Sequence, residues 1–319
     1  MRRGQNVGVR ESGRPEERRC DGVLVTGAYG LIGHAVVERL RANGRRVVAT
    51  DRLTTPPADA AFEAESLTIG GVRKLTAALK SHRVDTIVHA AGLSGPMLAQ
   101  KQLRRVFRTN VDGTLDLYEA ARQAQVRRIV LLSSAAAYGR NTGALVDEDT
   151  PLLGSEAYAA SKIGAEAVAR AYAAGRSVES LVLRPCWVYG ARRRTDCVLR
   201  RMVEDAVAGR LTELSYGKGF PRQFIHVSDV AAAVEAAVAV DCKSFEVFNL
   251  SDGSWLTLDE VGEKVRSLLP AARVALGPMK PPDDEALGRL DLSRADLVLN
   301  WRPSIPLARG LVDYMVPPI

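Results

Sequence analysis

Cysteine is scarce in this sequence, and long apolar runs are missing from it. The four cysteines, Cys20, Cys186, Cys197 and Cys242, form no CxxC pair, and no histidine accompanies them at the spacing of a metal site. This pattern predicts neither a disulfide framework nor a bound metal, and it favours a reducing, cytoplasmic location. No apolar run reaches 18 residues, so we expect no membrane-spanning helix and no membrane partner.

The charge is moderately basic and partly local. The 319 residues include 44 Lys and Arg against 37 Asp and Glu, a net charge of +7. Six arginines and four acidic residues fall within the first 22 positions. Because blocks of charge are usually solvated, we expect residues 1–20 to be a flexible basic leader that binds no nucleic acid. The rest has the composition of a soluble globular protein.

Short apolar runs alternate with helical patterns through the first 185 residues. Such runs are typical of strands buried on both faces, and the segments between them are long enough for crossover helices. The fold class predicted is therefore α/β, with a doubly wound parallel Rossmann sheet. The strand candidates are VLVT (23–26), RRVVATD (45–51), TIVHAAG (86–92), RIVLLSS (128–134) and SLVLRP (180–185).

The stretch TGAYGLIG follows the first of these strands and opens a helical pattern. Gly27, Gly30 and Gly33 can form a tight turn that admits a pyrophosphate close to the main chain, although the GxxGxxG spacing is also compatible with a purely structural turn. Asp51 ends the second strand, where a carboxylate can accept the ribose hydroxyls and repel a 2′-phosphate. Together, the glycine turn and Asp51 favour NAD as the cofactor. Arg52 could hold a 2′-phosphate, so NADP is the alternative.

A second motif, YAASK, places Tyr158 and Lys162 on one helix face. A phenol, with a reference pKa of about 10, is a poor base near neutral pH, but a neighbouring ammonium favours its phenolate form. An exposed tyrosine above a solvated lysine is the alternative interpretation. Ser134 ends a strand 24 residues before Tyr158. It would thus lie in the ligand crevice, where it can hydrogen-bond the substrate oxygen.

Taken together and in this order, the motifs resemble the extended short-chain dehydrogenase/reductase superfamily. Within it, they are similar to the UDP-galactose 4-epimerase-like members of the NAD-dependent sugar epimerase/dehydratase family. The resemblance covers nearly the whole chain after the leader. It rests on TGAYGLIG, Asp51, HAAG (89–92), NVDGT (110–114), SSAAAYG (133–139), YAASK, LRPCWVYG (183–190), RQFIHVSDVA (222–231), FNLSDG (248–253) and LVLNWRPSIPLARGL.

The resemblance implies roles for residues at the matching positions. It selects Ser134 over Ser133 as catalytic, together with Tyr158, Lys162 and Asn110. The implied cofactor contacts are Gly27, Tyr29, Gly30, Leu31, Ile32, Gly33, Asp51, Arg52, Ser66, Leu67, Ala90, Ala91, Gly92, Asn110, Ser133, Tyr158, Lys162 and Pro185. The implied substrate contacts are Ser94, Ser134, Ala135, Trp187, Arg194 and Arg222.

The resemblance also implies an organisation of the chain. Residues 21–185 are expected to form the NAD-binding Rossmann domain, to which residues 223–248 return. Residues 186–222 and 249–319 are expected to form a smaller, discontinuous substrate-binding domain. The helices on the cofactor side are expected to make the four-helix bundle of a homodimer.

Ala135 and Ala136 reduce the number of reactions that the resemblance leaves open. Family dehydratases carry an Asp-Glu pair directly after the catalytic Ser or Thr, and decarboxylases carry a Glu at nearly the same place, whereas this chain has Ala135 and Ala136. The remaining reactions are epimerisation of a nucleotide-linked sugar, most simply at C4, and net oxidation or reduction by a dehydrogenase or ketoreductase. A non-catalytic NAD-binding scaffold is a third possibility.

Several positions depart from the family or have two interpretations. Trp187 stands where the family usually has an Asn that touches the substrate, which weakens the case for an ordinary UDP-hexose. Arg222 matches an arginine that meets the substrate pyrophosphate, a task suited to a planar guanidinium. Arg194, with its two arginine neighbours, is either a substrate contact or part of a charged surface loop. His89 and His226 are interpreted as neutral core histidines.

Overall fold

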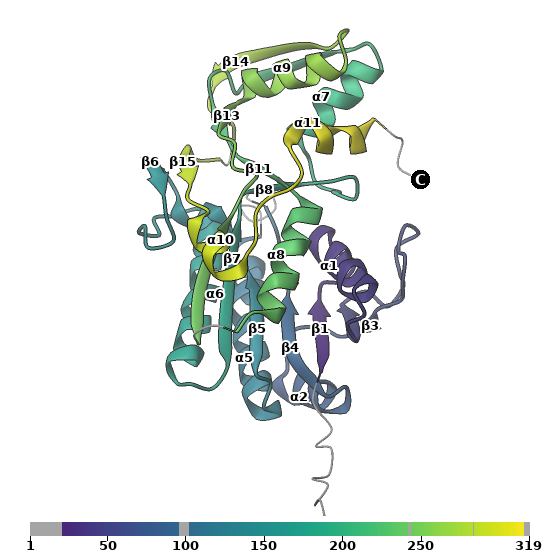
Figure 1. The fold of residues 1–319 in the computed structure, drawn as a ribbon, viewed down its shortest axis with the longest axis vertical. Helices are drawn as coiled ribbons and strands as arrows, with labels where there is room; N and C mark the ends of the chain where they lie inside the picture. The colour runs from purple at the N-terminus through teal and green to yellow at the C-terminus, as the bar shows by residue number, and fades with distance from the viewer. Residues whose placement is uncertain (1–20, 96–101, 242–243, 283, 316–319) are drawn as a thin grey trace, which may run out of the picture.

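The computed structural model describes residues 21–95, 102–241, 244–282 and 284–315 (Figure 1). A parallel sheet of seven strands forms its centre, in the order β12-β7-β5-β4-β1-β2-β3. This confirms the predicted α/β fold class and the five strand candidates. The strands are β1 (Gly22–Thr26), β2 (Val47–Asp51), β3 (Glu65–Ser66), β4 (Val84–His89), β5 (Arg128–Leu132), β7 (Glu179–Pro185) and β12 (Phe245–Leu250).

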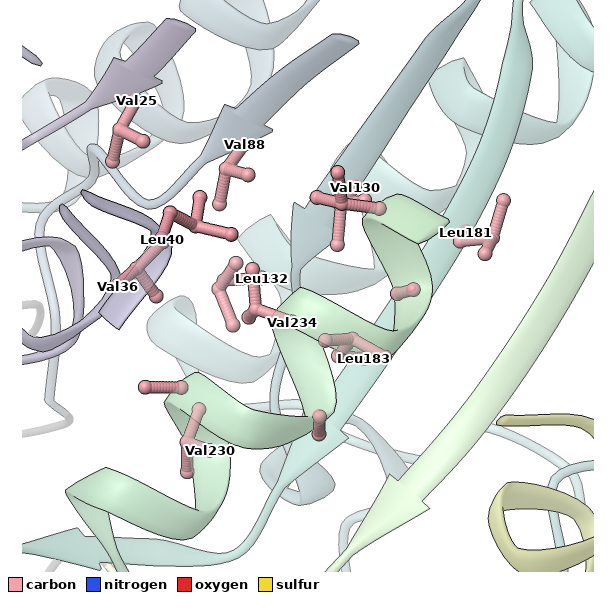
Figure 2. Close-up of a cluster of buried hydrophobic side chains, with 14 of the residues drawn as sticks. Val25, Val36, Leu40, Val88, Val130, Leu132, Leu181, Leu183, Val230 and Val234 are labelled. Carbon is pink, nitrogen blue, oxygen red and sulfur yellow. The ribbon is translucent and has the colours of Figure 1, made fainter. Parts of the chain in front are cut away.

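The inner strands are largely apolar because each of their faces packs against helices. On one face, Val25, Val88 and Val130 join a core with α1 (Leu31–Ala42) and α8 (Val227–Ala239) (Figure 2). Their strand neighbours point the other way, as side chains alternate along a strand. Leu24, Ile87 and Ile129 accordingly pack with α2 (Val72–Ser81), α5 (Gly113–Ala124) and α6 (Ala157–Ala174).

Two irregular connections bear on the site. The short helix α4 (Leu103–Phe107) continues through a π-helical turn, η1 (Arg108–Asp112), directly into α5. After β5, the chain makes a 3-10 turn, η2 (Ala135–Tyr138), and then forms β6 (Asn141–Val146). Neither irregular turn has a signature in the pattern of apolar residues.

A smaller group of elements gathers around a third core at the end of the molecule away from α2 and α5 (Figure 1). Short strand pairs support it: β9 with β14, β8 with β11, and β10 with β13. The division into two domains stays a prediction. The elements are β8 (Trp187–Tyr189), α7 (Val198–Val207), β9 (Leu211–Tyr216), β10 (Pro221–Arg222), β11 (Phe224–His226), β13 (Leu256–Thr257), α9 (Leu258–Leu268), β14 (Arg273–Met279), α11 (Leu307–Gly310) and η3 (Leu311–Tyr314).

The C-terminal part returns to the sheet domain before it ends. Strand β15 (Leu287–Leu290) pairs with β6, and α10 (Ser293–Leu299) lies against α8 and β12. Among the described residues, no helix is both long and apolar enough to cross a membrane. Cys186 and Cys197 are free thiols, whereas Cys20, Cys242 and the predicted leader lie outside the described residues. The cytoplasmic location stays a prediction.

Candidate active site

A cavity of about 710 Å³ opens at the carboxyl ends of the central strands. In sheets of this topology, this edge is where ligands bind. The wall contains nearly all the predicted site residues: Gly27, Tyr29, Gly30, Leu31, Ile32, Gly33, Asp51, Arg52, Leu67, Ala90, Ala91, Gly92, Ser94, Ser133, Ser134, Ala135, Tyr158, Lys162, Pro185, Trp187, Arg194 and Arg222. Ser66 and Asn110 do not line it. Ser66 is exposed on β3, where it pairs with Asp51.

The glycine turn is built for close approach. Gly27 has φ +67°, and a Cβ atom there would lie 2.8 Å from the main chain of Ala91. A Cβ atom on Gly33 would overlap the carbonyl oxygen of Gly27. Helix α1 starts after Gly30 with no side-chain cap, so the amide groups of its first turn stay available to an anion. The turn therefore fits a dinucleotide pyrophosphate.

Asp51 is fixed at the end of β2 by the main chain around it. Its carboxylate accepts hydrogen bonds from the amides of Tyr29, at 3.0 Å, and Leu53, at 3.2 Å. A carboxylate has about four acceptor positions, so lone pairs remain for ribose hydroxyls. The position and charge of Asp51 fit NAD better than NADP.

Three groups of the predicted chemistry meet in the cavity. Tyr158 lies in the first turn of α6 and is 8% exposed. One turn later, Lys162 places its Nζ atom 5.8 Å from the centroid of the Tyr158 ring and donates a 2.7 Å hydrogen bond to the Leu132 carbonyl. Ser134 Oγ accepts a 3.2 Å bond from the Ala136 amide. Its own proton is thus free to point to a ligand.

Asn110 lies behind the cavity wall. Its side chain donates to Leu93 O at 3.0 Å and to Ser161 Oγ at 2.9 Å, and accepts from Leu93 N at 2.8 Å. The side chain therefore joins the loop after β4 to helix α6. In this arrangement, its contacts are to protein groups that hold the wall.

His89 is buried in a similar supporting position. Its ring nitrogens lie 2.9 Å from Thr26 Oγ1 and 3.1 Å from Thr114 Oγ1. Thr26 Oγ1 also accepts from the Ala91 amide at 3.1 Å. Burial, and secondly the charge of Lys162, lowers the pKa of His89 to about 3, as expected for a desolvated base. The ring is neutral and fixes the cofactor loop, in keeping with its interpretation as a core histidine.

The far end of the cavity carries a partly buried ion pair beside the indole of Trp187. Arg222 donates from Nε to Asp284 at 2.8 Å. Its guanidinium carbon lies 4.3 Å from the centroid of a Trp187 ring, and that of Arg193 lies at 5.1 Å. Contacts of this length are typical of cation–π pairs. Trp187 thus lies against two guanidinium groups, and any anion that binds Arg222 must share it with Asp284 or displace that carboxylate.

Arg194 forms an ion pair with Asp59, which lies in the loop after β2. Arg194 is more than half exposed and lies 2.9 Å from Asp59; Arg192 lies 2.9 Å from the same carboxylate. The charged-loop interpretation describes this contact better than a substrate contact does, although Arg194 also lines the cavity. His226 is buried and bonds to Asp313 at 2.8 Å.

Sequence reasoning missed several residues around this site. Asp284 and Asp59 lie in irregular segments with no motif. Glu166 and Arg184 form a buried pair behind Ser133, whose hydroxyl donates to Glu166. One signal was available for Glu166, since it is four residues after Lys162 and so continues the same helix face.

Comparisons with known proteins agree with this geometry. The sequence model described as NAD dependent epimerase/dehydratase family matches residues 23–251, more than half of the chain. A UDP-glucose 4-epimerase of Mycolicibacterium smegmatis is 30% identical over 306 residues, which cover 90% of this chain and 95% of that protein. A dTDP-4-dehydro-6-deoxy-D-allose reductase of a Streptomyces species is 27% identical over 316 residues, covering 91% and 94%.

A solved structure gives the same result. MoeE5 in complex with UDP-glucuronic acid and NAD superposes with a TM-score of 0.82 at 32% identity, over 92% of this chain and 97% of that one. The predicted family resemblance is therefore confirmed. The chain is an NAD-dependent enzyme and belongs to the NAD-dependent epimerase/dehydratase family.

Proposed function

We propose that this protein epimerises a nucleotide-linked sugar, most simply at C4. The supporting observation is that Ser134, Tyr158 and Lys162 line one cavity, while the η2 turn beside Ser134 offers only Ala135 and Ala136. These groups suffice to move one proton to and from a hydroxyl. They do not supply, at that turn, the carboxyl groups by which family dehydratases eliminate water.

Each residue has a distinct task in the proposed reaction. Tyr158 takes the proton of the reacting sugar hydroxyl and later returns it. Lys162 stabilises the phenolate, and Ser134 donates a hydrogen bond to the same sugar oxygen. The glycine turn and Asp51 hold the cofactor. Bound NAD supplies the acceptor and donor of hydride, which leaves the carbinol carbon and returns to the opposite face of that carbon, inverting it.

The substrate class follows from the far end of the cavity. Arg222 is buried and planar, and it is supported by Trp187, a geometry that suits a diphosphate. The names of the relatives point the same way, since the first is an epimerase of UDP-glucose. The allose reductase relative favours the alternative reaction, in which the product leaves after one transfer and the cofactor is exchanged.

The two reactions differ in what happens to the cofactor. Purified protein is denatured and the supernatant is assayed for NAD; the native protein is then incubated with a panel of UDP- and dTDP-sugars. We expect released NAD, an isomer product by mass spectrometry and chromatography, and no lasting rise in absorbance near 340 nm. A parallel incubation contains free NAD, and accumulation of NADH there in proportion to the sugar consumed would reject epimerisation in favour of net oxidation.

We further propose a homodimer that uses the helices on the α5 and α6 face. In support, Leu103 and Phe107 on α4 and Leu115 on α5 are exposed, with 46% of Leu115 accessible. Exposed apolar side chains on neighbouring helices are suited to association. Sedimentation velocity is expected to give a dimer for the wild type and a monomer for Leu115→Glu. A monomeric wild type at micromolar concentration would reject this proposal.

A further inference from the structure

Helix α6 forms hydrogen bonds to two successive residues at the end of strand β5, Leu132 and Ser133. Lys162 donates to the carbonyl of Leu132 at 2.7 Å, and Glu166, one turn later, accepts from the hydroxyl of Ser133. Ser134 comes next along the chain. The residue proposed to contact the reacting oxygen is therefore placed by its immediate predecessor, which is tied to the helix that carries Tyr158.

Glu166 is in turn held by a buried arginine. Arg184, from β7, donates to its carboxylate through Nε at 3.0 Å and Nη2 at 2.6 Å. Arg184 is 1% exposed and Glu166 is 3% exposed. This bidentate geometry fixes the carboxylate in both position and orientation. Taking two charges out of water is costly, so such a pair is weak grounds for stability and calls for another role.

The same arginine reaches the far side of Ser134. Its Nη1 atom donates to the Tyr138 hydroxyl at 2.8 Å and to the carbonyl of Glu148 at 3.1 Å. Tyr138 ends the η2 turn, and Ser134 Oγ caps the start of that turn. One buried network thus bonds to the chain on both sides of Ser134: to Ser133 before it and to Tyr138 after it.

We infer that Glu166 and Arg184 are positioning residues that set the Ser134 hydroxyl toward the substrate oxygen, acting through Ser133. The inference rests on the proposed function, because it assigns the network to the same reaction. Glu166 and Arg184 do not line the cavity, so the inference assigns them no contact with the cofactor. Its effect is exerted on turnover through the placement of one hydroxyl.

The test is a double-mutant cycle of Ser133→Ala and Ser134→Ala, which spares the buried charges. We expect Ser133→Ala to lower kcat about 10-fold, within what misplacement of a reacting group can cost. KM for the sugar and the pH profile of kcat are expected to stay at wild-type values, because Arg222 and Tyr158 are untouched. Ser133 lines the cavity and is among the implied cofactor contacts, so NAD content is measured for each variant and kcat is compared at saturating NAD. In the Ser134→Ala background, Ser133→Ala is expected to lower kcat no further, because the Ser134 hydroxyl that Ser133 positions is already absent.

A matched control is available on strand β7, at a serine that also bonds to helix α6. Ser180 is also fully buried, and its hydroxyl donates to the carbonyl of Ala169 on α6 at 3.3 Å, away from the cavity. Ser180→Ala is expected to turn over at the wild-type rate. Glu166→Gln, which keeps the side-chain shape, is expected to reproduce the loss in kcat if it folds, as judged by circular dichroism.

The outcomes separate the inference from the function on which it rests. If Ser134→Ala turns over like the wild type, the proposed role of Ser134 is wrong and the inference falls with it. If Ser134→Ala is slow but Ser133→Ala is not, or if the two losses multiply, the positioning role alone is overturned. A loss for Ser133→Ala that is absent in the Ser134→Ala background supports it.

Discussion

Lys162 Nζ and the main-chain oxygen of Leu132 are 2.7 Å apart, and this hydrogen bond joins helix α6 to the last residue of strand β5. The bond holds the ammonium beside the Tyr158 ring in the cavity wall. Because α6 carries both side chains and β5 leads into Ser134, the proposed chemistry depends on the contact between one helix and one strand end.

Tyr158→Phe tests the proposed proton acceptor. The variant keeps the ring and its packing but loses the hydroxyl, and positioned acid–base groups contribute about 10²- to 10⁴-fold. We expect kcat to fall by at least about 100-fold, with NAD content unchanged. The rate of isomer formation and the NAD released on denaturation measure the two effects.

Tyr172→Phe is the control for that experiment, since it removes another hydroxyl from α6, one that bonds Glu119 at 3.1 Å. Its turnover is expected to match the wild type. Wild-type turnover by the Tyr158 variant would remove this tyrosine from its assigned role.

Asp51→Asn tests the discrimination between NAD and NADP. The substitution removes a negative charge from the end of β2, and unit charges about 4 Å apart at a protein surface interact by roughly 4 kcal/mol at most. We expect the affinity ratio of NAD to NADP to fall at least about 10-fold, as measured by calorimetry on protein freed of cofactor. Adding Arg52→Ala is expected to weaken NADP binding again. An unchanged ratio in Asp51→Asn would contradict the assignment.

Arg222→Lys tests the diphosphate contact. Lysine keeps the charge but loses the bidentate geometry and the stacking on Trp187. A hydrogen bond to a charged group contributes about 1.5–3 kcal/mol, so we expect KM for the nucleotide sugar to rise at least about 10-fold with little change in kcat. Arg201→Lys, on the exposed side of α7, serves as control. Equal KM values for wild type and Arg222→Lys would exclude this contact.

His89 gives the protein a specific acid sensitivity. In the unfolded chain a histidine binds a proton below about pH 6.5, whereas burial lowers the pKa of His89 in the folded protein to about 3. Between these values the unfolded chain binds more protons, so the free energy of unfolding falls as the pH is lowered, by up to about 1.4 kcal/mol per pH unit.

His89→Gln isolates that contribution, because glutamine cannot be protonated. Urea unfolding of both proteins from about pH 7 to about pH 4 is expected to show a shallower loss of stability for the variant. All other titrating groups are shared, so the difference between the two slopes belongs to this ring. Parallel slopes would mean that His89 is not buried as a neutral base.

Much of the frame could be predicted from the sequence. Strands buried on both faces are largely apolar, and the cofactor turn needs glycines whose Cβ atoms would collide with backbone, as at Gly33. Helix periodicity places Tyr158 and Lys162 on one face, but their catalytic role is implied by the order of the motifs and the family resemblance and not by that spacing alone. These features are local, so they are visible in short windows of sequence.

The missed features depend on contacts between distant segments. Asp284 pairs with Arg222 across 62 residues, and Asp59 meets Arg194 across 135. No window of sequence contains both partners. Asn110 is a different case: the motif located it, but only the fold shows that its amide is occupied by Leu93 and Ser161. Local patterns thus identify candidates, and tertiary packing decides which face the cavity.

The central claim is that a hydrogen removed from the sugar returns to the same carbon without leaving the site. The most direct measurement uses a nucleotide sugar deuterated at C4 and follows the product by mass spectrometry and NMR. We predict an isomer that keeps its deuterium at C4, with no deuterated cofactor in solution. A product without that deuterium, formed together with free deuterated NADH, would contradict the account and establish net oxidation.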